Sequence, residues 1–249
     1  MDTSQLNGHT AAVHLAGEPV AGRWTPAKKA RILTSGVQGT QSLSASLAEL
    51  EQPPAVLVCA SAIGFYGDRP GETLTEASAQ GSGFLPQVVR AWEAAADPAR
   101  AAGIRGVHLR FGVVLSGRGG ALPRMLLPFR FGLGGPIGIG NQFVSWVELD
   151  DAVGAITHAI EHDEVDGPVN VVSPHAVTNR EFARALGRVL RRPAFCRVPA
   201  CVIRLILGEM GRELLLSSTH AVPGRLVASG FAFRYPNLAD ALRHVLTSH

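Results

Sequence analysis

Short apolar runs alternate along the chain with longer segments in which apolar positions recur at helical spacing. The short runs predict buried strands at 11–16, 55–60, 106–115 and 167–173. The longer segments predict helices over 26–50, 84–102 and 150–162. Strands that alternate with helices in this way are typical of a parallel sheet covered by crossover helices, so the pattern predicts an α/β protein.

The pattern changes at residue 173. Thr178 and Glu181 form a T-x-x-E capping box, which predicts a helix that ends near 190. Shorter helical pieces follow at 199–209, 212–217, 223–230 and 237–247. We therefore predict a β/α layer over 1–172 and a smaller, mostly helical C-terminal lobe over 173–249.

Composition excludes several classes of protein. The chain is 46% hydrophobic and 17% charged, and its 249 residues allow one large domain, or one domain with a small lobe. The net charge is +3, but the only lysines are Lys28 and Lys29, and the arginines are spread along the chain without a block. Nucleic-acid binding needs basic residues gathered on one face, so we expect no nucleic-acid partner.

The cysteines and the apolar stretches bear on the compartment. The three cysteines form neither a CxxC pair nor an even framework, which indicates a reducing compartment. The first ten residues do not resemble a signal peptide. Arginines interrupt the most apolar stretches, 121–140 and 198–209. We expect a cytoplasmic protein with no membrane partner.

Two stretches contain residues that could form a metal site or a binding site. His158, Glu161 and His162 spell HAIEH on a predicted helix, a spacing that can hold zinc. The alternative is a solvent-facing helix end, which we prefer, so we expect no metal. The glycine-rich stretch 129–143 has no strand directly before it and is not a phosphate cradle. It predicts a shaped loop that serves binding, or alternatively a structural turn around Gly134–Pro136.

Several motifs together resemble one family. They are HLAGEP (14–19), SAIGFYGD (61–68), AWE (91–93), LRFGVVLSGRGG (109–120), LPFRFGLGGPIGIGNQF (127–143), WVELDD (146–151), NVVSP (170–174) and GFAFRYPNLADAL (230–242). In this order they resemble the epimerase-like branch of the short-chain dehydrogenases/reductases. The resemblance implies a Rossmann-like domain over 1–172 that binds NADP or NAD, and a lobe over 173–249 that closes on a small-molecule substrate.

The chain departs from that family at its front. The resemblance aligns the strand at HLA with about the fourth strand of the family. It implies that the first two β-α units, each roughly 30 residues, and the next strand are not in this sequence. The glycine-rich phosphate-binding turn would go with them. We therefore expect a truncated copy of the family fold.

A second departure concerns the catalytic pair. The family's superfamily typically uses Tyr-x-x-x-Lys, in which lysine lowers the pKa of the tyrosine. Here the corresponding positions are Leu85 and Val89, and no lysine follows Lys29. The resemblance leaves Ser61 and Tyr66 as the catalytic candidates, with a packing role and a satisfied hydroxyl as the alternative for Tyr66.

Two local departures lie within well-matched motifs. Gly36 stands where the family mostly carries Arg, and Glu148 where it mostly carries His. A glycine within a helix costs about 1 kcal/mol relative to alanine, so Gly36 should weaken the helix beside the cofactor.

The family's other site residues carry over by position. For the cofactor they are Ala16, Gly17, Arg110, Phe111, Gly112 and Val113. For the substrate they are Arg130, Gly135, Gln142 and Trp146. Structural alternatives are a strand-ending turn at Gly17, an ion pair at Arg110 and a core anchor at Trp146, which is the role we favour for Trp146.

Three functions remain open. The first is an NAD(P)-dependent epimerase or reductase that acts on a small, nucleotide-linked or free, carbonyl or hydroxyl compound. The second is a non-catalytic module that senses a dinucleotide or binds a partner, which the absent Tyr-Lys pair favours. The third is a truncated product that exposes part of its sheet, aggregates and binds no cofactor.

Overall fold

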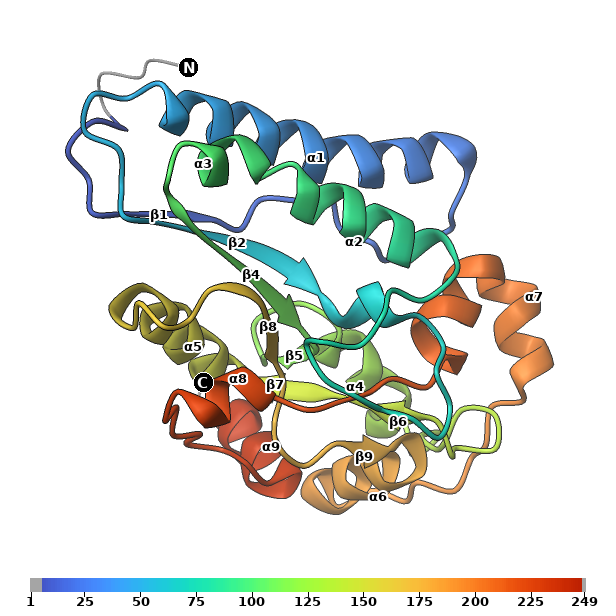
Figure 1. The fold of residues 1–249 in the computed structure, drawn as a ribbon. Coiled ribbons are helices and arrows are strands. Elements are labelled where there is room, and N and C mark those ends of the chain that lie inside the picture. The colour runs from blue at the N-terminus through green and yellow to red at the C-terminus, as the bar shows by residue number, and fades with distance from the viewer. Residues whose placement is uncertain (1–5, 248–249) are drawn as a thin grey trace.

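A computed structural model describes residues 6–247 and contains a parallel sheet at its centre (Figure 1). Its four strands are β1 (Ala11–His14), β2 (Val56–Ala62), β4 (Arg105–Phe111) and β8 (Gly167–Val171), in the order β1-β2-β4-β8. Every neighbouring pair is parallel, and Val58 lies opposite Val107 in the register of the two central strands. The α/β prediction is confirmed.

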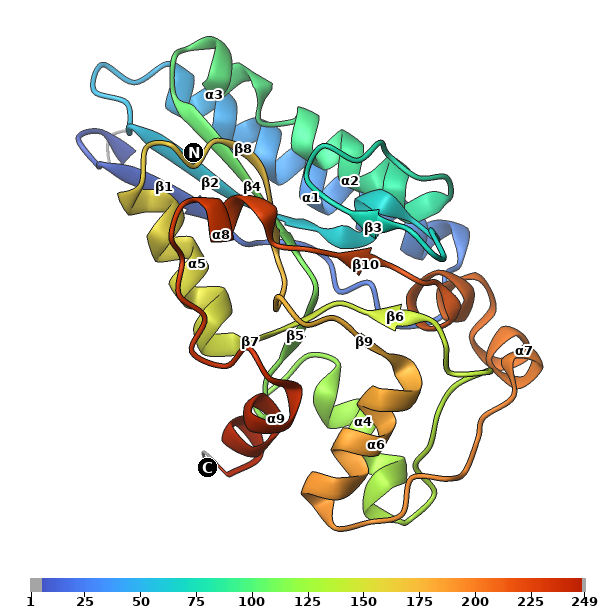
Figure 2. The ribbon, with the colours of Figure 1, turned by 60° about the horizontal axis from the view of Figure 1, so that its bottom comes forward.

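Helices cover both faces of this sheet, as Figures 1 and 2 show. One face packs against α1 (Pro26–Ala48), α2 (Phe84–Ala94) and α3 (Asp97–Ala101), and the other against α5 (Leu149–Glu161) and α8 (Gly224–Ala228). Alternate residues of a strand point to opposite faces. Accordingly, Leu57 packs towards Leu47 of α1, whereas Val58 belongs to the cluster that includes Ala155 of α5.

Two predicted elements are each divided in the structure. The predicted helix over 84–102 is α2 followed by α3, with Pro98 in the first turn of α3. The predicted strand over 106–115 is β4 followed by β5 (Val113–Leu115), and the break falls at Gly112. A Cβ on Gly112 would lie 2.6 Å from the Ser145 carbonyl oxygen, so only glycine lets the chain cross there. Beyond the break, β5 leaves the central sheet and pairs with β7 (Trp146–Glu148).

The C-terminal part adds helices and short strands around a second core. This core gathers Trp146, Phe182 and Leu242 from β7, α6 (Asn179–Leu190) and α9 (Leu238–Thr247). The predicted capping box at the start of α6 is confirmed by both of its hydrogen bonds. The remaining elements are η2 (Ile63–Tyr66), β3 (Thr73–Leu74), α4 (Leu122–Arg130), β6 (Phe143–Val144), β9 (Val177–Thr178), α7 (Ala200–Gly211), η3 (Arg212–Leu216) and β10 (His220–Ala221).

The chain after residue 173 returns to the first part at several points. Strand β10 pairs with β3, and β9 pairs with β6. The Glu213 carboxylate accepts hydrogen bonds from the Phe84 and Leu85 amides at the start of α2. The division at residue 172 stays a prediction. No helix within residues 6–247 is both long and apolar enough to cross a membrane.

The arginines are not spread evenly over the surface. Arg184, Arg188, Arg191 and Arg192 surround one surface hollow at the C-terminal end of α6. Our expectation of scattered basic residues is therefore wrong for this end of the molecule. Arginines spaced four apart in sequence come together on one side of a helix.

Candidate functional site

The carboxyl ends of the central strands define the edge at which ligands bind in open parallel sheets. Because β1, β2, β4 and β8 all run in the same direction, the segments that follow them meet at this one edge. The predicted site residues at this edge include Ala16 and Gly17 after β1, Ser61 near the end of β2 with Tyr66 shortly after it, and Gly112 after β4.

A buried ion pair lies beneath this edge. Arg110 of β4 donates from Nε and Nη2 to the two carboxylate oxygens of Glu93, both at 2.8 Å. The Arg110 side chain is only 4% exposed and that of Glu93 13%. Ser61 of β2 donates to the same carboxylate at 2.6 Å. The guanidinium and the carboxylate thus form two parallel hydrogen bonds. Through these bonds and the one from Ser61, Glu93 joins α2 to both β2 and β4.

Tyr66 completes this buried network. Its hydroxyl donates to Oδ1 of Asn170 at 2.7 Å and accepts from Nη1 of Arg110 at 3.0 Å. The side chain is wholly buried, and the Arg110 guanidinium stacks 3.6 Å from the centre of the neighbouring Phe65 ring. Burial raises the pKa of Tyr66, so the phenol keeps its proton near neutral pH. This is the packing alternative with a satisfied hydroxyl, and the catalytic role of Tyr66 stays a prediction.

Ser61 shares this placement. It is 4% exposed, and its hydroxyl proton is directed at Glu93. The two catalytic candidates are thus brought into one network, but both face the interior instead of an open cleft.

Trp92 fixes the segment that follows β1. A Cβ on Gly36 of α1 would lie 3.2 Å from the Trp92 ring, and one on Gly17 would lie 3.5 Å from it. The indole Nε1 donates to Oγ1 of Thr40 at 2.8 Å. The indole therefore lies between the end of β1 and α1, and Gly36 serves close helix packing here. Helix propensity alone predicts that Gly36 weakens α1. The structure adds that a glycine here leaves room for the Trp92 ring.

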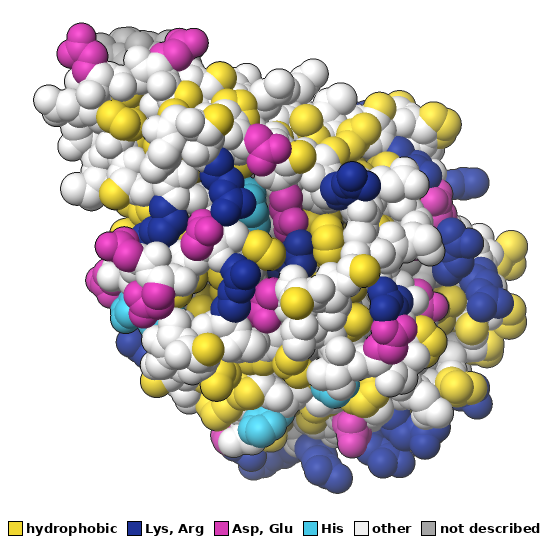
Figure 3. Space-filling view, in the orientation of Figure 1, with side chains coloured by type: hydrophobic (Ala, Val, Ile, Leu, Met, Phe, Trp, Pro, Cys, Tyr) yellow, Lys and Arg dark blue, Asp and Glu magenta, His cyan; other side chains and the backbone are white. Residues whose placement is uncertain are grey.

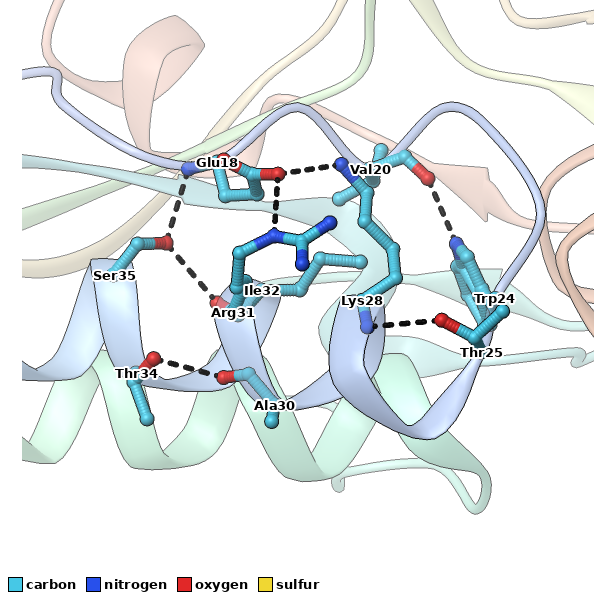
Figure 4. Close-up of polar contacts among 10 residues, drawn as sticks. All are labelled: Glu18, Val20, Trp24, Thr25, Lys28, Ala30, Arg31, Ile32, Thr34 and Ser35. Carbon is cyan, nitrogen blue, oxygen red and sulfur yellow. Dashed lines mark hydrogen bonds and ion pairs between the residues drawn. The ribbon is translucent and has the colours of Figure 1, made fainter.

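The loop after β1 is also tied to α1 (Figure 4). Glu18 accepts from Nζ of Lys28 at 2.7 Å, and its backbone amide donates to Ser35 at 3.0 Å. The hydrogen bond from Lys28 lowers the pKa of Glu18. Ala16 and Gly17 are nevertheless exposed, so this loop presents open backbone at the carboxyl edge.

The predicted substrate residues differ in their surroundings. Gln142 donates its side-chain amide to the carbonyl oxygens of Ile137 and Leu215, which joins two loops. Arg130 is exposed in the last turn of α4. A Cβ on Gly135 would lie 2.3 Å from the Cys196 carbonyl oxygen, which supports the structural-turn alternative for the glycine-rich stretch.

Trp146 has the core role that we favoured for it. The side chain is completely buried, and its indole nitrogen donates to the His175 carbonyl oxygen at 3.1 Å. Phe111 and Val113, which flank the Gly112 break, are half-buried. Phe111 packs against the core of the central sheet and Val113 against the second core.

Sequence reasoning assigned no role to Glu93 or Asn170, although both lie in motifs that carry the resemblance. They are the partners that hold Ser61, Tyr66 and Arg110 in place. The signal that could have found Glu93 is the need of a buried arginine for a carboxylate.

The two histidines of HAIEH have other partners. Nε2 of His158 is 2.8 Å from the Ser229 hydroxyl, and Nδ1 of His162 is 3.0 Å from the His158 carbonyl oxygen. Glu148, the other local departure, caps α5 through the amides of Asp150 and Asp151. Glu148, Asp150 and His244 have ligand atoms within 4.8 Å of one another, but the capping already engages Glu148.

Comparison with known proteins defines the class. Residues 198–245 match the family model of a domain of unknown function, DUF1731. The epimerase family protein SDR39U1 of Bos taurus is 40% identical over 253 residues, which span 99% of this chain and 85% of the relative. The human SDR39U1 structure with NADPH superposes with a TM-score of 0.90 at 37% identity, covering 96% of this chain and 82% of that one. A nucleoside-diphosphate sugar epimerase from Corynebacterium glutamicum gives a TM-score of 0.81 at 35% identity, covering 99% of this chain and 48% of that one.

The parallel sheet and its carboxyl-edge loops thus place the chain among Rossmann-like α/β proteins of the epimerase type. Within that class, it belongs to the epimerase family that includes SDR39U1. The family resemblance seen in the motifs is confirmed.

Proposed function

We propose that the protein is an NAD(P)-dependent, epimerase- or reductase-like enzyme whose substrate is a small carbonyl or hydroxyl compound, free or nucleotide-linked. The observation that carries this proposal is the likeness, at a TM-score of 0.90, to a human relative whose structure contains NADPH. The open backbone of Ala16 and Gly17 lies at the sheet edge where such a cofactor binds.

The exposed backbone at this edge fits one wall of a dinucleotide site. The polar side chains predicted for the site do not fit direct hydrogen bonding to the dinucleotide. Ser61, Tyr66 and Arg110 are buried, and each is already hydrogen-bonded to a protein partner. They would support the edge from beneath, as positioning residues, without touching the cofactor. Of the residues predicted to contact the cofactor, Ala16 and Gly17 are exposed, whereas Phe111, Gly112 and Val113 are half-buried, so the segment around Ala16 is the more open to a flat ring or a ribose.

A variant of Ala16 tests this wall. Ala16→Glu places a carboxylate at the open edge, where it would repel a dinucleotide that carries phosphate charges. Ala101→Glu, at the exposed end of α3, adds the same charge beside the amino end of β4, at the opposite edge of the sheet. We expect saturable NADPH binding in the unaltered protein and in Ala101→Glu, and none in Ala16→Glu. Similar melting temperatures for both variants would show that the loss is local.

Hydride transfer separates the enzyme from its alternative. The alternative is a dinucleotide sensor, favoured by the buried, fully hydrogen-bonded hydroxyl of Tyr66. NADPH oxidation is measured over a panel of carbonyl compounds that includes nucleotide-linked sugars. Turnover supports the enzyme, and binding without turnover on any compound supports the sensor. Absence of NADPH binding, measured by nicotinamide fluorescence and by the melting temperature, would overturn both.

A further inference from the structure

Two segments without acidic residues lie side by side at one end of the molecule. Residues 122–147 contain Arg124 and Arg130, and residues 182–208 contain six arginines. Neither segment holds an Asp or a Glu, although the whole chain has 20 of them. Backbone hydrogen bonds join the two segments, from Cys196 to Gly134 and from Val198 to Pro136. This end of the fold is therefore cationic and apolar.

The cationic part is a stripe along α6. Four arginines lie within about 80° of one another around the axis of α6, three of them spaced by four residues and the last directly after the helix. We call them the α6 stripe: Arg180, Arg184, Arg188 and Arg191. Figure 3 shows Lys and Arg side chains gathered along the lower edge of the molecule, where Figure 1 places α6.

Most of this positive charge is not neutralised locally. Among residues 6–247, no ion pair joins the side chains of Arg188, Arg191 or Arg192 to an acid. A basic residue in the last turn is explained by the helix dipole. That explanation does not extend to Arg184 or to Arg192, which lies beyond the helix. Together with Ala194 and Phe195, the arginines at positions 184, 188, 191 and 192 line a hollow of about 420 Å³.

Large apolar side chains project beside these arginines. Phe131 is 74% exposed, Leu133 63% and Phe195 75%. We call these three residues the apolar tips. They belong to two adjoining loops, since a Cβ on Gly132 would lie 3.9 Å from Pro193. Apolar side chains that are exposed together on a rim of arginines mark an interaction surface.

We propose that the α6 stripe and the apolar tips dock the protein on an anionic lipid bilayer. Arginines near such a membrane are attracted by its negative surface potential, and phenylalanine and leucine enter the headgroup region. A second copy of this chain is disfavoured, because a two-fold contact would bring arginine against arginine. A nucleic acid would match the arginines but gives no reason for three exposed apolar tips. The proposed contact is peripheral and departs from our expectation of no membrane partner; within residues 6–247 no helix is long and apolar enough to cross the bilayer.

Vesicle flotation of the full chain tests the proposal. The probes are vesicles of phosphatidylcholine alone, and of phosphatidylcholine with phosphatidylglycerol at roughly 2:1. We expect binding only to the anionic vesicles, and weaker binding as salt rises. Each arginine near such a surface strengthens binding roughly fivefold, so Arg188→Gln/Arg191→Gln/Arg192→Gln should weaken it about a hundredfold.

A second variant and a matched control keep the outcome clear. Phe131→Ser/Phe195→Ser should also reduce flotation, and the high exposure of both side chains means that the fold is retained. The control Arg23→Gln/Arg31→Gln/Arg90→Gln removes the same charge near α1 and α2, on the other side of the molecule, and should float normally.

Four results would overturn the proposal. They are equal flotation with neutral vesicles, equal loss in the control variant, concentration-dependent dimerisation that the Phe131→Ser/Phe195→Ser variant abolishes, and binding of an oligonucleotide through the stripe without vesicle binding. None of these readouts depends on NADPH or on turnover, so failure here is distinct from failure of the proposed enzymatic function.

Discussion

Removal of the Glu93 carboxylate should strongly destabilise the fold. In Glu93→Ala, the Arg110 guanidinium keeps its charge but loses both carboxylate contacts. Tyr66 is then its only remaining hydrogen-bond partner among the described residues. The Arg110 side chain is only 4% exposed, so its guanidinium has already lost most of its hydration in the folded state. The variant thus creates an unpaired buried charge.

The magnitude follows from this burial. Breaking a buried pair by removing one partner costs about 3–5 kcal/mol. For a chain of this size, each kcal/mol lowers the melting temperature by about 2–4 °C, which gives a fall of roughly 10 °C. Urea unfolding followed by circular dichroism measures the free energy directly, and the m-value checks that the denatured state is unchanged.

Two further variants complete the test. Asp240→Ala breaks the pair with Arg243, in which both side chains are more than half exposed, and should cost at most about 1 kcal/mol. Glu93→Leu/Arg110→Met removes both buried charges and should recover part of the stability lost in Glu93→Ala. A cost for Glu93→Ala no greater than that for Asp240→Ala would refute the reasoning.

Three other substitutions or treatments have defined outcomes. Gly36→Ala should not give the gain of about 1 kcal/mol that helix propensity predicts, because the new Cβ would lie 3.2 Å from the Trp92 ring; urea unfolding measures this. Burial raises the pKa of the Cys59 thiol to about 12, so iodoacetamide at pH 8 should label Cys201 and spare Cys59 in the native protein, as read by mass spectrometry. Burial lowers the pKa of His108, so the unfolded chain binds a proton that the folded one does not, and stability should fall as pH drops below about 6.5.

Each of these predictions has a control. Gly154→Ala, also within a helix, meets only the outer atoms of Phe231 at 3.4 Å and should gain stability. Labelling of Cys59 at the same rate as Cys201 would contradict the burial argument. His108→Leu also removes a buried Nδ1 that has no partner among the described residues, and should reduce the loss of stability between pH 7 and pH 5. If His108→Leu loses as much stability between pH 7 and pH 5 as the unaltered protein, His108 is not the cause. The loss would then point to His14 and His158, whose pKa values burial also lowers.

Hydrophobic periodicity predicted the central fold well because each element there buries a regular face. The strand at 55–60 and the helix at 26–50 appear as β2 and α1 with shifts of at most two residues at either end. Helix α4 was missed, since Pro128 within it and the glycines after it favoured a loop. The break in the predicted helix over 84–102 was missed because α2 and α3 together preserve the apolar spacing.

The site was harder to predict than the fold because its partners are remote in sequence. Tyr66 and Asn170 are 104 positions apart, and Ser61 and Glu93 are 32 apart. No local spacing encodes such pairs, so the family resemblance could identify the residues but not which of them are satisfied by one another. The α6 stripe, by contrast, is local. Its four-residue spacing was visible in the sequence, and a helical projection of 180–192 would have revealed it.

The buried network changes which atoms at the carboxyl edge are available for function. Ser61, Tyr66 and Arg110 have reactive side chains, yet their hydrogen bonds are directed at Glu93, Asn170 and one another. To open any of them to a ligand, the protein would have to break or expose the Arg110–Glu93 pair. The loss of stability would then be similar to that expected for Glu93→Ala. The network is therefore better suited to fixing the ends of β2, β4 and β8 than to moving protons. We therefore predict that the proposed dinucleotide makes direct contact with the exposed backbone after β1, where the Trp92 ring packs close to Gly17 and Gly36.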